Sequence, residues 1–237
     1  MLKLASRSWL RPKFERGKTF EHDFIHFEDF EAKIIDGKRY YFAPDGNAYP
    51  SVTTVLGVKK DKTHLDKWIK RVGAEEAEKI KIQAGNRGTS IHTICESYML
   101  NEECYPEGVM PANIMTFKNI KPVLDEHVGT VYAIEAPLYS KDFHVAGRTD
   151  CIAQFDGITS IIDFKTSLKI KKDEWIGDYF LQATCYGEMA CRLSNSLEIP
   201  QIVIIISVDG QPEPQVFIKN RYDYLEEMKE KFDGSVR

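Results

Sequence analysis

Two aspartates and a lysine stand on either side of a tight-turn signal in the second half of the chain. Asp156 and Gly157 separate two apolar runs, and an Asp-Gly pair supplies the positive φ angles that a two-residue hairpin turn requires. With these two residues at the centre of the turn, Asp150 faces Asp163 across the hairpin. Because side chains alternate along a strand, Lys165 shares a face with Asp163. The sequence therefore predicts two carboxylates and an ammonium group on one face.

Facing carboxylates repel each other, so this part of the hairpin needs a proton, a cation or compensating side chains. Directly opposed Cβ atoms lie about 5 Å apart, where like charges are destabilising. A divalent metal ion removes the conflict, because hard Mg²⁺ prefers carboxylate oxygens. The alternative is a solvated ladder of alternating charge in which Arg148 and Lys165 neutralise the pair. The hairpin alone leaves both interpretations open.

A histidine lies at the edge of an amphipathic helix expected at residues 86–101. Apolar side chains recur there with helical spacing, at Ile91, Ile94, Cys95 and Tyr98. His92 is one position round from this stripe, and Glu96 follows one turn later on the same face. A histidine in such a place is either a packed, hydrogen-bonded side chain or a ligand that joins the carboxylates.

A later helix, expected from Asp173 to about Leu193, carries four large or polar side chains near one face: Trp175, Tyr179, Gln182 and Tyr186. Trp175 and Tyr179 are expected to pack into the core. Gln182 and Tyr186 lie at i and i+4, and such neutral groups can bind a phosphate or the edge of a base.

Composition limits the class of protein. The 237 residues are 43% hydrophobic and 29% charged, which is ordinary for a globular domain and excludes a largely disordered chain, a collagen or a coiled-coil rod. No apolar run approaches the ~20 residues that a membrane-spanning helix needs. The five cysteines form no CxxC pair, which argues against a zinc or disulfide framework.

Charge leaves nucleic acid possible as a partner. The net charge of −4 argues against a surface coated in positive charge. Residues 59–87 nevertheless carry a local excess of lysine and arginine within helical segments. A basic groove on an acidic body is therefore compatible with this chain. The first 18 residues are also basic, as in a mitochondrial transit peptide or a basic N-terminal arm.

The order of elements predicts an α/β fold. Residues 24–56 are expected to form strands, with a hairpin between 32–35 and 39–42, followed by helices over 59–83, 86–101 and 112–127. Strands are expected at 131–139, 143–155, 159–166, 202–208 and 216–219, with a helical tail from Asn220. This order predicts one domain with a mixed central sheet flanked by helices. Residues 1–56 form its N-terminal arm and β extension, and residues 57–237 its helical segment and core.

In this order and spacing, the residues resemble the RecB-like branch of the PD-(D/E)XK nuclease superfamily. The matching elements are Gly88-x-x-x-His92-x-x-x-Glu96, an acidic residue on the next strand (Glu135), Gly147-Arg148-Thr149-Asp150, Asp163-Phe164-Lys165-Thr166, and Gln182-x-x-x-Tyr186. Each is weak alone, whereas five in order are specific. Tyr49-Pro50-Ser51-Val52-Thr53-Thr54-Val55-Leu56 is also similar to the P-S-V-T-x-V-L segment of the mitochondrial genome maintenance exonuclease family and its phage-encoded relatives.

The resemblance implies a PD-(D/E)XK core and hydrolysis of DNA phosphodiester bonds with Mg²⁺ or Mn²⁺. Asp150 and Asp163 would hold the metal, with His92 as a third ligand and the Phe164 carbonyl as a fourth. Lys165 would complete the catalytic set by orienting the attacking water and offsetting developing charge. No iron–sulfur cluster is expected, because the cysteine spacing departs from that of the iron–sulfur relatives.

The resemblance also implies a set of substrate-binding residues: Glu135, Arg148, Thr166, Gln182 and Tyr186. Glu135 would place a second metal or a water. The basic helices would border a channel for a DNA strand, with Lys59, Lys60, Lys62 and Arg71 as candidates. Either Trp68 or Trp175 is a candidate for stacking on a base, and core packing is the alternative for both.

We therefore expect a single-strand-preferring DNA exonuclease that acts as a monomer without membrane attachment. A bacterial or phage-infected cytoplasm is the expected compartment, with a mitochondrion as the alternative. An endonuclease or junction resolvase would keep the fold with another cleavage mode. A non-catalytic DNA-binding subunit is disfavoured, because the chain keeps Asp150, Asp163 and Lys165.

Overall fold

The computed structural model describes residues 11–58 and 63–232, and within them two β-sheets. A small antiparallel sheet comprises β1 (Ala32–Ile35), β2 (Lys38–Phe42) and β3 (Ala48–Pro50). The main sheet has the order β4-β5-β6-β7-β8, formed by Val128–Ser140, Val145–Phe155, Ile158–Ser167, Gln201–Val208 and Gln215–Asn220. Only β6 and β7 run parallel, so the sheet is mixed, as the sequence predicts.

The described helices are α1 to α6, and two short 3₁₀ turns precede α5 and α6. Their bounds are Val52–Val58, Thr63–Val72, Ala74–Met99, Pro111–His127, Gly177–Ser194 and Leu225–Phe232, and the turns are Asp173–Trp175 and Arg221–Tyr224. Among the described residues, no helix is both long and apolar enough to cross a bilayer. Lys59, Lys60 and Lys62, which are expected to border a DNA channel, lie outside the described residues, as do the basic residues 1–10.

Residues 24–31, expected as strand, belong to no strand, and the starts of three helices differ clearly from expectation. Residues 52–56, expected as strand, begin α1, because the Ser51 hydroxyl accepts a hydrogen bond from the backbone N–H of Thr54 (3.0 Å) and caps the helix. This cap outweighs the strand preference of the valines and threonines in the segment. Helix α3 starts at Ala74 rather than near residue 86. Helix α5 starts only at Gly177, after the separate 3₁₀ turn.

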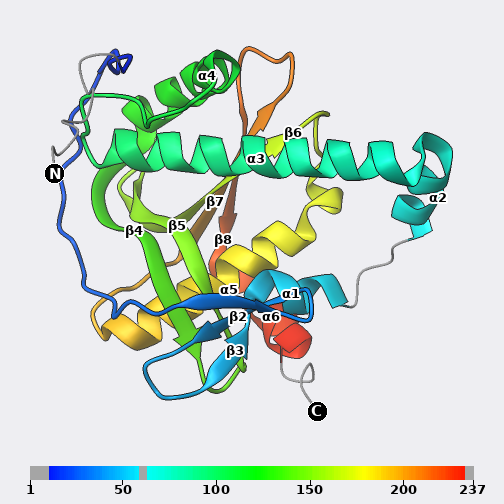
Figure 1. Ribbon diagram of the computed structural model, residues 1–237. Helices are drawn as coiled ribbons and strands as arrows, with labels where there is room; N and C mark the ends of the chain where they lie inside the picture. Colours follow the sequence, from blue (N-terminus) through cyan, green and yellow to red (C-terminus); the bar gives the residue numbers. More distant parts are fainter. Residues whose placement is uncertain (1–10, 59–62, 233–237) are drawn as a thin grey trace, which may run out of the picture.

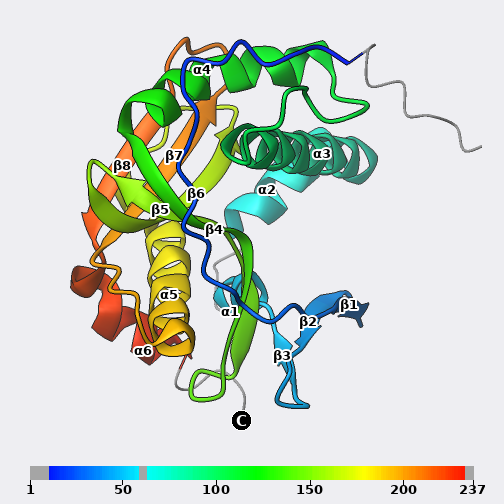
Figure 2. The same ribbon diagram turned by 90° about the vertical axis from the view of Figure 1, so that its left-hand side faces the viewer.

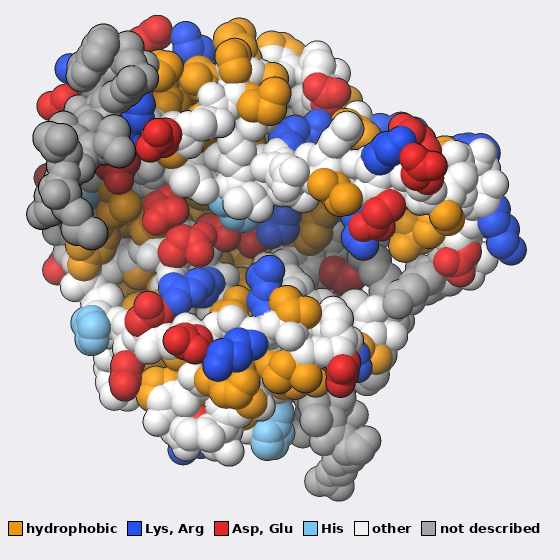
Figure 3. Space-filling view, viewed as in Figure 1, with side chains coloured by type: hydrophobic (Ala, Val, Ile, Leu, Met, Phe, Trp, Pro, Cys, Tyr) orange, Lys and Arg blue, Asp and Glu red, His pale blue; other side chains and the backbone are white. Residues whose placement is uncertain are grey.

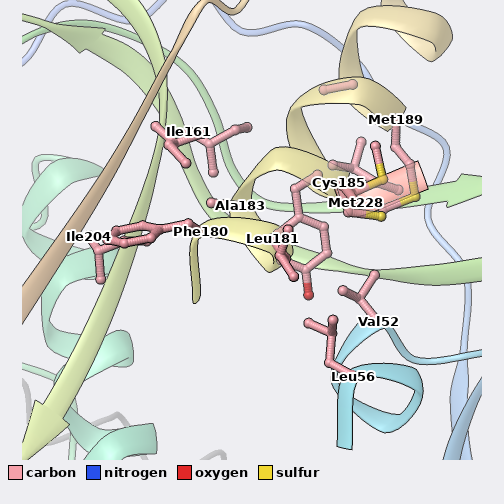
Figure 4. Packing of buried hydrophobic residues seen from close by; sticks show 14 of the residues in the cluster. Val52, Leu56, Ile161, Phe180, Leu181, Ala183, Cys185, Met189, Ile204 and Met228 are labelled. Carbon is pink, nitrogen blue, oxygen red and sulfur yellow. The ribbon is translucent and has the colours of Figure 1, made fainter. Parts of the chain in front are cut away.

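Helices cover both faces of the main sheet. Residues Ile202, Ile204 and Ile206 of β7 pack with α1, α5 and α6, whereas Val203 and Ile205 pack with α3 and α4. Figures 1 and 2 show α3 and α4 on one side of the sheet and α5 on the other. Figure 4 shows α1 packed against α5 in the first of these cores. β7 lies between β6 and β8, which confirms the expected interior position of residues 202–208.

The central hairpin has the predicted register. Cys151 pairs with Ile162 and Phe155 with Ile158, while Asp156 and Gly157 form the turn with φ of 51° and 78°. Asp150 and Asp163 stand one position beyond the last pair. The Asp-Gly signal therefore predicts both the turn and the alignment of the two aspartates.

Candidate metal centre

Side chains from three elements converge just beyond the last pair of this hairpin, at the end away from the turn. His92 of α3, Glu135 of β4 and Asp150 of β5 each offer one ligand atom, and these atoms all lie within 4.8 Å of one another. His92 Nδ1 is 3.2 Å from Asp150 Oδ1. All three residues are half-buried. Such a group of imidazole and carboxylates has the donor types that bind a divalent transition metal or Mg²⁺.

The side chain of Glu135 reaches His92 and Asp150 because the backbone of β4 adopts a left-handed conformation at this residue. Ile134 and Ala136 pair with Cys151 and Thr149, so Glu135 lies across from Asp150. Its φ is 49°, in the left-handed region that few non-glycine residues adopt. Ile134 and Ala136 consequently pack into opposite cores, although residues two apart in a regular strand share a face.

The backbone of Glu135 is held by Arg148. Arg148 Nη1 donates a hydrogen bond to the Glu135 carbonyl (3.0 Å), and its Nη2 pairs with Asp29 and reaches the Phe30 carbonyl. The guanidinium thus connects β5, the turned residue of β4 and the N-terminal segment. Arg148, predicted to bind substrate, lines the pocket but is already engaged in positioning this backbone.

Asp150 links the histidine to the neighbouring strand. Its Oδ2 accepts a hydrogen bond from the backbone N–H of Phe164 (2.8 Å), while Oδ1 faces His92. Burial alone would raise the pKa of Asp150, but the hydrogen bond and charge of His92, with Lys165 nearby, hold it below its ordinary value. Asp150 is therefore a stable anion at neutral pH.

Asp163 and Lys165 form a buried ion pair next to this group. Asp163 is 2% exposed, and Lys165 Nζ pairs with its Oδ2. The Oδ1 atom of Asp163 is buried and finds no hydrogen-bond partner within the described part of the chain. Burial raises the pKa of Asp163 despite the lysine. Burial would lower the pKa of Lys165, but the charges of Asp163 and Asp150 raise it above its ordinary value.

A buried, unpartnered carboxylate oxygen beside three convergent ligand groups fits a divalent cation. Unsatisfied buried polar atoms are rare in folded proteins and destabilise them when left unpaired. The predicted ligands His92 and Asp150 do come together. Asp163 is not among the three groups within 4.8 Å, and Glu135, predicted to bind substrate or a second metal, takes that place.

A pocket of about 710 Å³ opens over these residues, between α3 and the N-terminal sheet. Figure 3 shows this hollow, with acidic and basic side chains gathered in it and along its rim. Its lining includes seven of the site residues predicted from the sequence: His92, Glu135, Arg148, Asp150, Lys165, Gln182 and Tyr186. The predicted site residues thus make up about half of the pocket lining.

Eight further lining residues are not among the predicted site residues: Arg39, Tyr41, Ser51, Thr53, Gly88, Thr89, Thr93 and Glu96. Ser51 and Thr53 belong to the P-S-V-T segment, and Gly88 and Glu96 belong to the motif around His92; both segments carry the family resemblance. Arg39 and Tyr41 lie on β2, and no local motif marks them.

Of three further residues predicted to bind substrate, Gln182 and Tyr186 line the pocket and Thr166 does not. Gln182 and Tyr186 are buried and adjacent, with Gln182 Nε2 3.5 Å from the Tyr186 hydroxyl. Thr166 is half-buried but does not line the pocket. A Cβ added to Gly88 would lie 4.0 Å from Thr166 Oγ1, so α3 passes close to the end of β6.

The two candidate stacking tryptophans also differ. Trp68 is half-buried in α2, whereas Trp175 is 60% exposed. The expectation that Trp175 packs into the core is wrong, because the 3₁₀ turn of Asp173–Trp175 ends before α5 begins and carries the indole away from the core. Tyr179, one turn into α5, does pack against the core.

Comparison with known proteins identifies relatives in two mammals. Human mitochondrial genome maintenance exonuclease 1 is 29% identical over 180 residues, covering 70% of this chain and 51% of the human one. Its mouse counterpart is 27% identical over 132 residues, covering 53% and 39%. The chain therefore spans about half the length of the human relative. No protein-family model matches the chain.

A solved structure described as an exonuclease from Eubacterium rectale has a TM-score of 0.40 and 16% identity, covering 62% of this chain and 64% of that one. The relationship to nucleases that the sequence predicts rests instead on the mammalian homologues and is confirmed by them. The chain is thus similar in sequence to two mammalian proteins that are named as exonucleases.

Proposed function

We propose that this protein is a metal-dependent deoxyribonuclease with a PD-(D/E)XK core that digests single-stranded DNA from an end. The observation that carries the proposal is the meeting of His92, Glu135 and Asp150 beside the buried Asp163–Lys165 pair. Homology to an exonuclease supports the same reading. The whole chain would act as one nuclease domain and as a monomer.

The residues present fit Mg²⁺ or Mn²⁺. His92, Asp150 and Asp163 would hold the ion with the Phe164 carbonyl, and Glu135 joins this set. The imidazole makes the site more favourable to Mn²⁺ than one built of oxygen alone. When bound, such an ion lowers the pKa of a coordinated water and polarises the scissile phosphate.

Lys165 would stabilise negative charge as it develops on the phosphate. Its raised pKa keeps the ammonium protonated at neutral pH, so it acts as a charge and hydrogen-bond donor rather than as a base. The pair with Asp163 fixes the ammonium in place before the substrate arrives. Lys165 Nζ also lies 5.3 Å from the centre of the Tyr179 ring, which restricts its movement further.

The pocket provides neutral donors for a strand. Gln182 and Tyr186 face it from α5, and hydroxyl groups line it from α3 (Thr89, Thr93), from the cap of α1 (Ser51) and from α1 itself (Thr53). Such groups contact phosphates without reading sequence. Thr166, at the end of β6, would contact the strand where it leaves the pocket. This lining supports DNA as the substrate without sequence specificity.

The name of the human homologue places that protein's role in mitochondria. For this chain we propose a bacterial or phage-infected cytoplasm, with a mitochondrion as the alternative, and no iron–sulfur cluster.

Cleavage of defined substrates tests the proposal. Linear single-stranded, linear double-stranded and circular single-stranded DNA are incubated with Mn²⁺, Mg²⁺ or EDTA, with labels at either end. We expect short products from one end of linear single strands, no cleavage in EDTA and intact circles. Asp163→Asn is the inactive control. Cleavage of circles would establish an endonuclease instead, and DNA binding without any metal-dependent product would establish a non-catalytic subunit.

A further inference from the structure

The segment between β6 and α5 carries exposed side chains that the catalytic proposal does not use. We propose that residues 168–175, the 168–175 loop, bind the DNA strand outside the catalytic pocket, with Trp175 stacking on a base. The inference rests on the proposed function, because it extends the path of the same substrate.

Trp175 is displayed rather than buried. Its side chain is 60% exposed, although tryptophan is usually among the well-buried residues. Its backbone N–H donates to the Lys172 carbonyl (3.0 Å), which closes the turn. Lys172 Nζ lies 5.3 Å from the ring centre. The indole is therefore held at the surface by an ordered turn.

The 168–175 loop combines this ring with positive charge. Three of its residues within four positions are lysines (Lys169, Lys171, Lys172). Its two acids are already paired, Asp173 with Lys219 and Glu174 with Lys172. Basic side chains interleaved with an aromatic ring are what sequence-independent single-strand binding requires, because every base has a stacking face.

The loop is anchored to the sheet. The backbone N–H of Lys171 donates to Gln215 Oε1 (2.7 Å), and Gln215 Nε2 donates back to the Lys171 carbonyl (2.8 Å). Ser167 Oγ donates to the Lys169 carbonyl (2.7 Å). A surface fixed in this way loses little conformational entropy when it binds a ligand.

The loop is continuous with the catalytic pocket. It begins three residues after Lys165 and leads into α5, whose Tyr179 ring faces Lys165 Nζ. Tyr179, Gln182 and Tyr186 follow on α5 with helical spacing, and the last two line the pocket. At about 1.5 Å rise per residue, Gly177 at the start of α5 lies roughly 14 Å from Tyr186 along the helix, and Trp175 precedes Gly177 by two residues. Several nucleotides, at about 3.4 Å each when stacked, span that length.

A protein partner is the competing occupant, because Leu168 and Ile170 are also more than half exposed. The loop carries three lysines against two acids, and Asp173 pairs with Lys219 outside the loop, so its net positive charge favours a polyanion. We therefore assign the surface to DNA and treat the protein partner as an outcome that overturns the assignment.

Intrinsic fluorescence provides a direct readout of stacking. Wild-type protein and Trp175→Phe are titrated with oligothymidylate of 20 residues in EDTA, while anisotropy of labelled DNA measures binding. We expect binding to quench the emission of the wild type and to leave that of Trp175→Phe almost unchanged. Equal quenching in both proteins would refute stacking on Trp175.

Affinity separates stacking from charge. Trp175→Ala should weaken binding about tenfold or more, and Trp175→Phe should recover most of it. An abasic nucleotide at the stacking position should weaken binding to the wild type but not to Trp175→Ala. Lys169→Ala with Lys172→Ala should reduce the slope of log K against log salt by roughly 0.7 per lysine, whereas Trp175→Ala leaves the slope unchanged.

Kinetics keep this inference separate from the catalytic proposal. With Mn²⁺, Trp175→Ala should raise KM about tenfold and leave kcat within about twofold. Tyr222→Ala, which removes another exposed ring (46% exposed), is the matched control and should change neither. A fully active enzyme with unchanged KM and affinity in Trp175→Ala would overturn only the loop assignment. Absence of cleavage and of DNA binding in the wild type would overturn the proposed function as well.

Discussion

His92 on α3 and Asp150 on β5 meet with Nδ1 and Oδ1 3.2 Å apart, while the other oxygen of Asp150 accepts the backbone N–H of Phe164 on β6. One carboxylate therefore fixes a helix and two strands at the point where the ligand groups converge. Asp150 consequently has both a structural and a chemical role, and substitutions can separate the two.

Asp150→Ala and Asp150→Asn should be equally inactive but differ in stability. Alanine leaves the Phe164 N–H without its acceptor, which we expect to lower the free energy of unfolding by about 1–3 kcal/mol. Asparagine keeps an acceptor oxygen and should lower it by less than about 1 kcal/mol. Urea unfolding and DNA cleavage of both variants check this. Equal stability of the two would show that the Phe164 contact contributes little.

Glu135 and Glu96 provide a second comparison, because both are half-buried acids that line the pocket. Only Glu135 belongs to the group within 4.8 Å. Calorimetric titration should show Mn²⁺ binding weakened at least tenfold by Glu135→Gln and changed less than about twofold by Glu96→Gln. A larger loss of Mn²⁺ affinity in Glu96→Gln than in Glu135→Gln would show that the metal binds one helical turn further along α3, next to Glu96.

The ring of Tyr186 packs so close to Gly147 that it leaves no room for a side chain there. A Cβ at this position would lie 2.8 Å from both Cε1 and the hydroxyl oxygen of that buried ring. Gly147→Ala should therefore destabilise the protein by about 1–3 kcal/mol and displace the tyrosine from the pocket. At Gly177 an added Cβ meets nothing within 4 Å. Gly177→Ala is the matched control, and thermal unfolding should leave it close to the wild type.

Glu188 gives stability a defined pH dependence away from the pocket. Burial would raise its pKa, but hydrogen bonds from Arg221 and Arg192, each at 2.9 Å, hold it below the ordinary 4.5. The lowered pKa means that this stabilisation is complete above pH 4.5 and is lost as the pH falls through the native value.

The comparison is therefore between the wild type and Glu188→Gln at several pH values. We expect the wild type to be more stable by about 2 kcal/mol between pH 6 and 8, and the difference to shrink below pH 4.5. Denaturant unfolding measures both. A difference that persists unchanged at pH 3 would mean that the carboxylate charge is not its source.

The sequence predicts the hairpin and the helix that carry the site, but not the placement of Glu135 and Trp175. The Asp156-Gly157 turn determines the hairpin register, and helical periodicity places His92 at the edge of the core; both are local signals. The placement of Glu135 depends on a left-handed backbone held by Arg148 from another strand, which no local pattern specifies. Trp175 was misplaced because a 3₁₀ turn and a following helix have similar spacing over a few residues.

The central claim is that one divalent cation binds between His92, Glu135, Asp150 and Asp163. Anomalous diffraction from crystals soaked in Mn²⁺ tests it most directly, with Asp163→Asn crystals as the control. We predict a single strong peak at about 2.0–2.3 Å from oxygen or nitrogen atoms of these side chains, much weaker in the variant. A peak elsewhere, or none at this site in a protein that still cleaves DNA, would contradict the account.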